Sequence, residues 1–361
     1  MGLALKIKAS KRPFVIAGPC SVETEEQVCK TISDLALNNQ VAMIRGGIWK
    51  PRTRPDSFEG IGQVGLQWLV NAAKEVNLPT TVEVANSKHV EQALKAGVDV
   101  LWIGARTTVN PFAVQEIADS LKGISIPVMI KNPINPDVQL WLGAFERLMN
   151  VGCNDLVAIH RGFSVYQHQF YRNAPHWEIS INLKQLLPQI PVICDPSHIA
   201  GNRKLIFEVA QKAMDLNYDV LMIETHTSPD NAWSDAKQQL TPIELSKVLN
   251  SLILREKQNE VSVSEGLITL RKKVQELDQT MLTLLSERMR LSKEIGSFKK
   301  ENNITILQEE LWERKLQETL DLAPGLELSS DFVHAFMDAV HLESIDHQMR
   351  VMNTTLNLKS E

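Results

Sequence analysis

Short, almost wholly apolar runs recur through the first 255 residues, and this repeat constrains the fold more than any other feature of the chain. The stretches between the runs carry helix-like patterning, as in residues 87–96, 111–121, 140–149 and 203–215. Strands that are apolar on both faces are typical of a parallel sheet, and eight strand–helix repeats in about 240 residues predict an α/β fold, a closed (β/α)8 TIM barrel. The expected strands cover residues 14–17, 41–45, 80–84, 100–103, 128–130, 156–159, 192–194 and 220–223.

Glycine and proline are distributed very unevenly, and this divides the chain. Residues 1–255 contain 14 of the 17 glycines and 15 of the 16 prolines. Many turns therefore give way to almost none, which indicates a change of architecture near residue 255. We predict a barrel domain over residues 1–254, a polar linker over 255–264 and an all-α helical domain over 265–361.

The expected helical domain begins with one long amphipathic helix. Apolar residues recur in alternating steps of three and four from Leu267 to Phe298, but at Arg288 the spacing demands an apolar residue. Two shorter helices are predicted over 308–322 and 329–352. Because a long apolar stripe usually needs a partner chain to cover it, we expect a homodimer or higher homo-oligomer through this domain.

Composition excludes several classes of function. Lys and Arg number 38 against 43 Asp and Glu, a net charge of −5, so no global cationic field exists to hold nucleic acid. No uncharged apolar run approaches the roughly 18 residues of a membrane span, and residues 1–8 do not resemble a signal peptide. Four cysteines in this length do not make a disulfide scaffold, so we expect a cytoplasmic protein; Cys29, Cys153 and Cys194 receive no role.

Polar side chains directly follow the expected strands, where barrel enzymes form their active-site mouth. Four of these side chains are of metal-ligand types. Each alone is weak evidence, since a lone cysteine can fill the core and Asp235 can cap a helix. Together, their mixed sulfur, nitrogen and oxygen donors predict a divalent Mn, Fe, Co or Zn ion rather than Mg or Ca. The four are Cys20, His198, Glu224 and Asp235.

Positively charged side chains gather at the same strand ends. Cations that converge on one mouth repel each other, and a ligand with several negative charges, such as phosphates and carboxylates, explains them. They are Arg45, Lys50, Arg52, Arg106, Lys131 and Arg161.

Seven short motifs, taken in order, resemble 3-deoxy-D-arabino-heptulosonate 7-phosphate (DAHP) synthase, the first enzyme of the shikimate pathway. The resemblance covers about residues 12–250 and is to the compact form that lacks an N-terminal regulatory domain. The motifs are Ala17-Gly18-Pro19-Cys20-Ser21, Lys50-Pro51-Arg52-Thr53, Gly104-Ala105-Arg106, Ile130-Lys131-Asn132, His160-Arg161-Gly162, Asp195-Pro196-Ser197-His198 and Ser234-Asp235.

This resemblance implies a role for each charged residue. The four donor residues would bind the divalent metal, a Lewis acid for the aldehyde, and Lys131 is the candidate proton donor. Arg52 and Thr53 would bind the phosphate of erythrose 4-phosphate. The implied phosphoenolpyruvate ligands are Arg45, Lys50, Arg106, Lys131 and Arg161.

A sibling enzyme is the nearest alternative for the barrel. It makes 3-deoxy-D-manno-octulosonate 8-phosphate from arabinose 5-phosphate, and it shares the barrel and the phosphoenolpyruvate cage. Its aldose loop typically carries an Asn-Arg pair where this chain has Lys50-Pro51-Arg52-Thr53. The Pro-Arg-Thr form favours the four-carbon sugar.

Three cations lie on the long predicted helix. At roughly 100° per residue, Arg288 and Lys299 share a face, whereas Arg271 lies about 100° away from Arg288. A straight helix cannot aim all three at one small ligand. Either Arg271 has no role, or it reaches a site on another chain.

The helical region resembles the all-helical chorismate mutases over about residues 265–352, through residues 270–278, 285–288, Lys299 and 344–348. The resemblance implies rearrangement of chorismate to prephenate, with the Arg of the first helix serving the partner's site. Lys299 and Gln348 would stabilise negative charge that develops on the ether oxygen. The implied chorismate and prephenate ligands are Arg271, Arg288, Lys299, Ser344 and Gln348.

One departure from the mutase pattern leaves two alternatives open. The family commonly has Asp-x-x-Arg-Glu in its second helix, but here Leu311 stands at the Arg and Trp312 at the Glu; Arg314, one turn on, is not expected to compensate. The chain is therefore either a bifunctional synthase and mutase, in which prephenate or chorismate bound at the helical domain inhibits the barrel, or a synthase whose helical domain only dimerises and senses a ligand.

Overall fold

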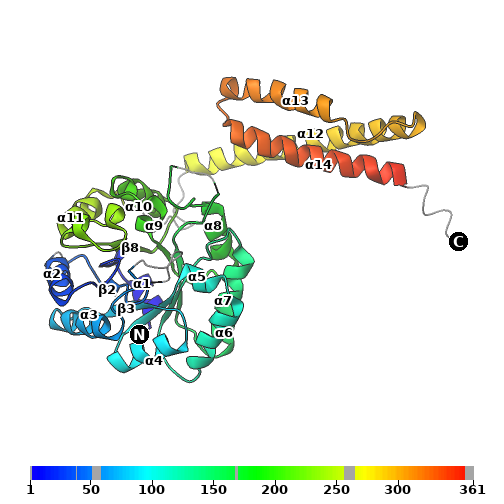
Figure 1. The fold of residues 1–361 in the computed structure, drawn as a ribbon. Helices are drawn as coiled ribbons and strands as arrows, with labels where there is room; N and C mark the ends of the chain where they lie inside the picture. Colours follow the sequence, from blue (N-terminus) through cyan, green and yellow to red (C-terminus); the bar gives the residue numbers. More distant parts are fainter. Residues whose placement is uncertain (1, 38, 51–57, 167–169, 256–264, 354–361) are drawn as a thin grey trace. The chain divides into compact units, whose positions relative to one another are not determined.

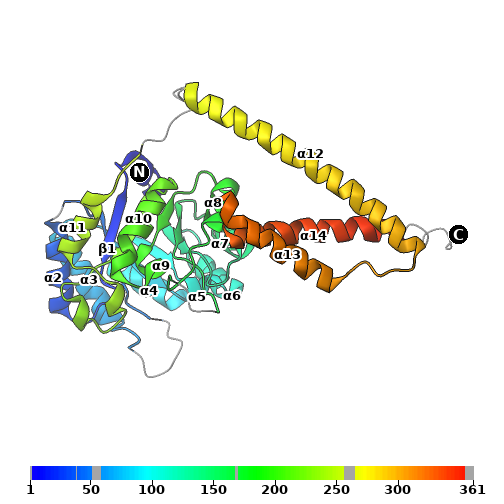
Figure 2. The ribbon, with the colours of Figure 1, turned by 90° about the horizontal axis from the view of Figure 1, so that it is seen from above.

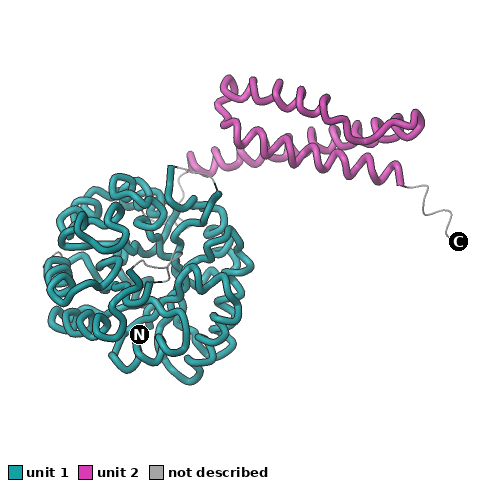
Figure 3. Tube along the Cα trace, in the orientation of Figure 1, with its two compact units in different colours: residues 1–257 teal, residues 258–361 magenta. Residues whose placement is uncertain are grey.

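The computed structural model describes residues 2–37, 39–50, 58–166, 170–255 and 265–353. The chain divides into two compact units, residues 1–257 and residues 258–361 (Figure 3). Apart from Arg255, the predicted linker lies outside the described residues.

Eight parallel strands of the first unit close into a barrel in sequence order (Figure 1). Nearly every strand residue is buried, as the continuous apolar runs require. The predicted TIM barrel is therefore confirmed. The strands are β1 (Phe14–Gly18), β2 (Met43–Gly46), β3 (Thr80–Val84), β4 (Val100–Ile103), β5 (Val128–Lys131), β6 (Leu156–His160), β7 (Val192–Cys194) and β8 (Val220–Glu224).

The pairing of β1 with β8 closes the barrel and sets the position of the site. Its register runs from Phe14 opposite Val220 to Gly18 opposite Glu224. Glu224 therefore ends its strand beside the loop that follows β1. Residues that are far apart in sequence meet at this carboxyl end of the barrel.

Helices surround the barrel, and α2 shows why they form. Thr24 caps its N-terminus by accepting a hydrogen bond from Gln27 N, and the buried Val28, Ile32 and Leu35 recur on one face. The helices of this unit are α1 (Leu3–Ala9), α2 (Glu25–Ala36), α3 (Gln63–Glu75), α4 (Ser87–Ala96), α5 (Ala105–Thr108), α6 (Pro111–Ser120), α7 (Val138–Asn150), α8 (Trp177–Leu186), α9 (Pro196–Ala200), α10 (Ile206–Asp215) and α11 (Pro242–Ser251), with 3₁₀ turns at η1 (Arg203–Leu205), η2 (Pro229–Asn231) and η3 (Ala236–Gln238).

The short helix α1 packs against the interior of the barrel. Leu3 and Ile7 are buried in one apolar cluster with interior strand residues such as Ile16 and Met43. The carboxylate of Asp155 accepts hydrogen bonds from the first backbone N–H groups of α1 and so caps it. The sequence patterns did not predict this helix.

The second unit consists of α12 (Glu265–Glu301), α13 (Glu309–Leu322) and α14 (Ser330–Asn353), with a 3₁₀ turn η5 (Ala323–Leu326) before α14. α14 packs against the C-terminal half of α12, where Gly296 is buried and a Cβ would lie 3.0 Å from the Cα of Gln348. Figure 2 shows the N-terminal half of α12 diverging from α14, and its side chains are mostly exposed. No described helix is both long and apolar enough to cross a membrane.

Candidate functional site

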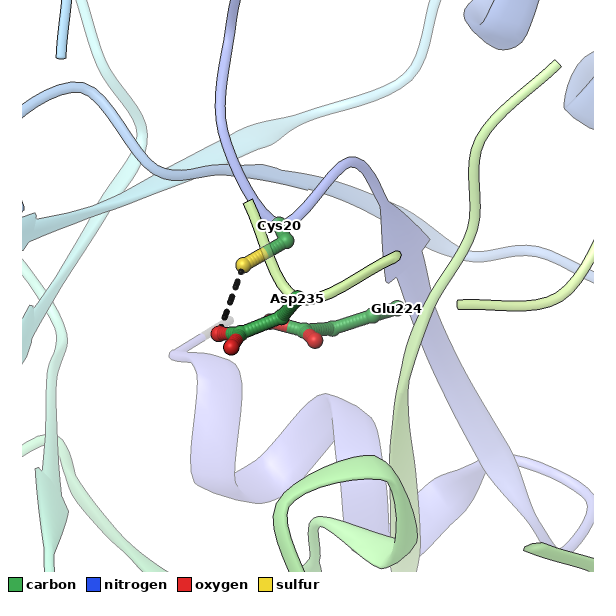
Figure 4. Close-up of side chains that lie close together, drawn as sticks. All are labelled: Cys20, Glu224 and Asp235. Carbon is green, nitrogen blue, oxygen red and sulfur yellow. Dashed lines mark hydrogen bonds between the residues drawn. The ribbon is translucent and has the colours of Figure 1, made fainter. Parts of the chain in front are cut away.

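Three of the predicted metal ligands meet at the carboxyl end of the barrel (Figure 4). One donor atom each from Cys20, Glu224 and Asp235 lies within 4.8 Å of the other two. Cys20 Sγ is 3.3 Å from Asp235 Oδ2. The three residues come from the loop after β1, the end of β8 and the loop after β8, so closure of the barrel assembles them.

The loop that carries Cys20 is held on several sides. Gln239 Oε1 accepts a hydrogen bond from Cys20 N at 2.9 Å, and Lys50 Nζ donates to Cys20 O at 2.6 Å and lies 2.9 Å from Sγ. Gly47 is required beside it, because a Cβ there would lie 2.1 Å from Cys20 O. Burial, and then the charge of Glu224, raise the pKa of the Cys20 thiol to about 12.

Asp235 has an unusual backbone conformation. Its φ of 47° lies in the left-handed region, and its side chain makes no cap hydrogen bond to the following turn. Instead the carboxylate contacts Cys20 and the guanidinium of Arg172, whose Nη1 is 3.0 Å from Oδ1. The alternative of Asp235 as a helix cap is therefore wrong. Burial would raise the pKa of Asp235, but the charges of Arg172 and His198 outweigh burial and hold that pKa below its ordinary value.

A small polar cluster ties the loop after β1 to the loop after β8. Ser21 Oγ shares a hydrogen bond of 2.5 Å with Ser234 Oγ and donates to Glu23 Oε1 at 3.0 Å. The same Glu23 oxygen accepts a hydrogen bond from Trp233 N at 2.8 Å. These hydrogen bonds between neighbouring residues of the two loops help to fix the distance between Cys20 and Asp235.

His198 completes the predicted donor set from α9, which follows β7. Its Nε2 is 3.7 Å from Glu224 Oε1, and its Nδ1 lies 2.7 Å from Asp195 Oδ2. One ring nitrogen at the site and the other against a carboxylate is the usual arrangement of a metal-binding histidine. Burial would raise the pKa of Asp195, but the charges of His198 and Lys131 hold it below its ordinary value.

The donors fit a divalent metal ion. Glu224 Oε2 accepts a hydrogen bond from Gln238 Nε2 at 2.6 Å, whereas the buried Oε1 accepts none from the described part of the chain. This oxygen has ion-pair contacts but no hydrogen bond within the described chain, and its position beside a thiol and an imidazole suits a borderline ion. A coordinating thiol gives up its proton. Cys20, His198, Glu224 and Asp235 are the residues that would hold the ion.

Arg45 and Lys131 are buried next to these donors. Arg45 Nη1 lies 3.2 Å from Glu224 Oε1, and Lys131 Nζ lies 3.2 Å from Asp195 Oδ2. Both cations also lie over the ring of Trp102, at 5.1 and 5.7 Å from its centroid. The sequence argument treated the cations as mutually repelling charges, but these two have buried carboxylate partners.

Arg161 differs because its hydrogen bonds go to neutral oxygens. Its Nη1 donates to Asn173 Oδ1 at 2.8 Å and to Gly162 O at 3.4 Å. The pKa of Arg161 is lowered to about 10, mainly by burial, which the charge of Asp195 opposes and the charges of Arg172 and Arg106 reinforce. The guanidinium remains charged at neutral pH, so this part of the mouth is best suited to an anion.

The remaining predicted barrel residues lie as follows. Arg106 is exposed on α5, close enough to Arg161 to affect its titration. Lys50 contacts Cys20. Arg52 and Thr53 lie outside the described residues.

A second cavity, of about 170 Å³, lies among α12, α13 and α14. Arg288, Lys299, Ser344 and Gln348 all line it, so Arg288 and Lys299 do share a face. Arg288 donates hydrogen bonds to Ser344 Oγ and Val340 O, and Lys299 donates to Ile306 O at 2.6 Å. Arg271 is exposed on α12 and does not line this cavity.

Sequence reasoning missed several polar residues of both sites. In the barrel these are Arg172, Gln238 and Gln239, which contact the predicted metal ligands without belonging to a recognisable motif. In the helical cavity Lys315 and His341 were missed, and the ring of His341 stacks on Trp312 at 3.8 Å. Helical periodicity from Leu311 would have pointed to Lys315 four residues on.

Two family models match the chain in succession. The DAHP synthetase I family matches residues 5–260, and chorismate mutase type II matches residues 270–349. The chain belongs to the DAHP synthetase I family. Its barrel is a DAHP synthase domain, and its helical region is a chorismate mutase domain, as the sequence motifs indicated.

Known relatives agree with this assignment. The synthase domain is 31% identical over 226 residues to phospho-2-dehydro-3-deoxyheptonate aldolase of Thermotoga maritima, covering 63% of this chain; the match spans 64% of the length of that relative. The crystal structure of the Thermotoga DAHP synthase has a TM-score of 0.59 at 26% identity, covering 66% of this chain and 67% of that one.

The sibling enzyme, which makes 3-deoxy-D-manno-octulosonate 8-phosphate, is a weaker match to this chain than the Thermotoga synthase is. A 2-dehydro-3-deoxyphosphooctonate aldolase of Paracidovorax citrulli is 25% identical over 279 residues, which cover 67% of this chain and 90% of that relative.

Proposed function

We propose that the chain is a bifunctional enzyme of aromatic amino acid biosynthesis. The synthase domain condenses phosphoenolpyruvate, erythrose 4-phosphate and water to DAHP and phosphate, and the mutase domain converts chorismate to prephenate. The observation that carries the first activity is the grouping of the buried Cys20 and Glu224 with the half-buried Asp235, at the carboxyl end of a barrel of this family. Arg45 and Lys131 are buried beside this grouping.

The barrel residues bind and orient two anionic substrates. Arg161 and Arg106 bind phosphoenolpyruvate, with Arg45, Lys50 and Lys131 around it. The enol carbon bonds to the aldehyde carbon, water adds to the carbon that carries the phosphate, and phosphate leaves. Lys131 Nζ, paired with Asp195 at 3.2 Å, holds a proton beside the reacting atoms. Arg52 with Thr53 binds the phosphate of the sugar.

A divalent ion, Mn, Fe, Co or Zn, would supply Lewis-acid polarisation of the aldehyde. The chain's own part is to hold the four donors and to keep their geometry through the Ser21, Glu23 and Ser234 cluster. All four cysteines are unpaired, which supports a reducing cytoplasm as the compartment.

The synthase proposal is tested by phosphoenolpyruvate consumption with erythrose 4-phosphate and, separately, arabinose 5-phosphate. We expect turnover with the four-carbon sugar, loss with a chelator, and recovery when a divalent ion is restored. Cys20→Ser should weaken retention of the ion and lower the rate, whereas Cys29→Ser, a half-buried cysteine of α2, serves as the control. Preference for arabinose 5-phosphate would favour the sibling activity instead.

In the mutase domain, the cavity promotes the rearrangement by binding one conformer of chorismate. Arg288 and Ser344 bind a carboxylate, and Lys299 with Gln348 stabilises the negative charge on the ether oxygen. The support is that all four side chains line one cavity and that Ser344 and Gln348 are buried. No nucleophile is required for this rearrangement.

A homodimer completes that cavity in our proposal. The N-terminal half of α12 exposes a stripe of apolar side chains that would pack against a second copy, and Arg271 on the same half would reach the partner's cavity. A charge in the stripe, as in Leu277→Glu, should shift the protein to monomers in sedimentation and remove mutase turnover. The stripe consists of Ile268, Leu270, Val274, Leu277, Met281 and Leu284.

We also propose that prephenate or chorismate, bound at the mutase domain, inhibits the synthase. The support is a cationic cavity in a domain that is fused to the barrel. Added prephenate should lower the synthase rate of the wild type and leave that of Arg288→Ala unchanged. Equal inhibition of both proteins would refute control through this cavity.

A further inference from the structure

The cavity of the mutase domain carries an excess of positive charge. Arg288, Lys299 and Lys315 line it, and none of its described lining residues is acidic. Burial lowers the pKa of His341, and the charges of Arg288 and Lys299 lower it further, so this imidazole adds no positive charge at neutral pH. A cavity with three cations and no acid is built for an anion.

Two buried polar atoms in the same cavity lack partners. Gln348 is 8% exposed, and its Oε1 makes no hydrogen bond within the described chain; the same holds for Nε2 of His341. Polar atoms buried in this way are normally satisfied, so a ligand with both donors and acceptors is indicated. These atoms point to a ligand independently of the charges.

Lys315 lies where the missing arginine would act. It follows Leu311 by four residues on α13, so the two share a face, and both line the cavity. Side chains of a helix tilt toward its N-terminus, so the Lys315 side chain lies over the turn that contains Leu311. Its ammonium makes no hydrogen bond or ion pair with any described residue.

Arg314, the cation next to Lys315 in sequence, does not line the cavity. It points off the cavity face and is paired with Glu318 at 4.0 Å. The side chain of Arg314 is 70% exposed. Lys315, and not Arg314, is therefore the candidate to replace the arginine of the family pattern.

We propose that Lys315 binds a carboxylate of the dicarboxylate ligand of this cavity, in place of the arginine that Leu311 replaces. This inference rests on the proposed binding of chorismate or prephenate. Trp312, stacked on His341 at 3.8 Å, forms the apolar wall beside it. Because an ammonium is a point charge on a flexible stem rather than a bidentate fork, Lys315 strengthens binding without fixing the carboxylate plane.

The test uses the full-length enzyme with chorismate as substrate and prephenate as titrant. Lys315→Ala should raise the KM for chorismate and the Kd for prephenate about tenfold, with kcat changed less than about threefold, because the contact is equal in ground and transition states. Lys315→Arg should retain wild-type binding. Arg314→Ala, one residue away and outside the cavity, is the matched control. Leu311→Arg in the Lys315→Ala background should restore binding.

The outcomes separate this inference from the proposed function. If the wild type binds prephenate and Lys315→Ala binds it as tightly as Arg314→Ala does, the role of Lys315 is overturned while the mutase proposal stands. If the wild type binds prephenate but does not turn chorismate over, the Kd values still decide the role of Lys315. If the wild type neither binds nor reacts, both proposals fall.

Discussion

The synthase and mutase domains handle charge in opposite ways. In the barrel, Arg45 and Lys131 are 1% and 4% exposed, and each faces a buried carboxylate. In the helical domain, Arg288, Lys299 and Lys315 line a cavity without an acidic side chain among its described residues. Next to the metal-ligand candidates the buried charges are thus paired within the protein, and in the barrel mouth Arg161, unlike these two cations, has only neutral hydrogen-bond partners among the described residues, whereas the cations of the helical cavity face no acidic lining residue.

This difference follows from the two architectures. A closed barrel buries its strand ends, and a buried charge must be paired or it destabilises the fold. Three helices with an exposed half of α12 leave their cations near solvent, which tolerates an unpaired charge. Substitutions at barrel charges should therefore impair folding or catalysis severely, and those in the helical cavity should mainly weaken binding.

The largest expected effect is at Lys131. Lys131→Met removes the proposed proton donor and the ion pair with Asp195, so the synthase kcat should fall about 10³-fold. The mutase rate of the same sample should be unchanged. Lys122→Met, an exposed lysine of the same domain, is the control. Equal losses in both activities would show that the two sites are not independent.

The next effect is on stability and depends on pH. Burial lowers the pKa of His160 to about 4, whereas an unfolded histidine titrates near 6.5. Between these values the unfolded chain binds a proton that the folded barrel does not, so stability falls with pH from about 6.5 to about 4, by up to about 3 kcal/mol.

Denaturant unfolding at pH 7 and pH 4.5 measures this loss. His160→Gln keeps an acceptor for the Tyr218 hydroxyl and a donor to Pro175 O, and it should flatten the pH dependence. His176→Gln, with a 38% exposed side chain, should not. If the free energy of unfolding of His160→Gln depends on pH as strongly as that of the wild type, His160 does not cause the loss of stability.

A smaller effect is expected in the helical cavity. Arg288→Ala removes a charged hydrogen-bond donor worth about 2 kcal/mol, so kcat/KM for chorismate should fall roughly 30-fold. The synthase rate without prephenate should not change. Retention of full mutase activity would show that the cavity among α12, α13 and α14 is not the chorismate site.

A weaker effect is expected at Arg172, a partly exposed cation of the barrel. Arg172 orients Asp235, and partners of metal-binding carboxylates tune affinity, so Arg172→Gln should weaken binding of Mn²⁺ about tenfold. Equilibrium dialysis with Mn²⁺ alone gives the affinity without an activity assay. Arg203→Gln, which removes a pair with the 85% exposed side chain of Asp230, is the matched control. Equal affinities in the two variants would exclude a positioning role for Arg172.

Much of the barrel could be predicted because burial leaves a local signal. Parallel strands that are covered on both faces read as continuous apolar runs, and residues directly after them must lie at one end of the barrel. Cys20 and Glu224 were found in this way. The helix α1 was missed because seven residues with two buried positions give no usable periodicity.

The electrostatic pairing could not be predicted in the same way. Glu224 was predicted to be a metal ligand, but nothing local in the sequence indicates that Arg45 lies 3.2 Å from it. Arg172 lies between β6 and α8 in no regular element, so its contact with Asp235 depends on how that segment returns to the barrel. To choose Lys315 rather than Arg314, one must know which face of α13 lines the cavity. A one-residue error in the predicted start of α13 would favour the other residue.

The proposed metal ligands come from both ends of the synthase domain, and Cys20 and Asp235 are 215 positions apart in sequence. A ribosome that has released the chain only as far as β7 has exposed the thiol and neither carboxylate. If these residues bind the ion as proposed, high-affinity chelation requires that the last strand has docked on the first. Uptake of an ion by a growing chain would then report, in a single event, that synthesis has passed β8 and that the barrel has closed.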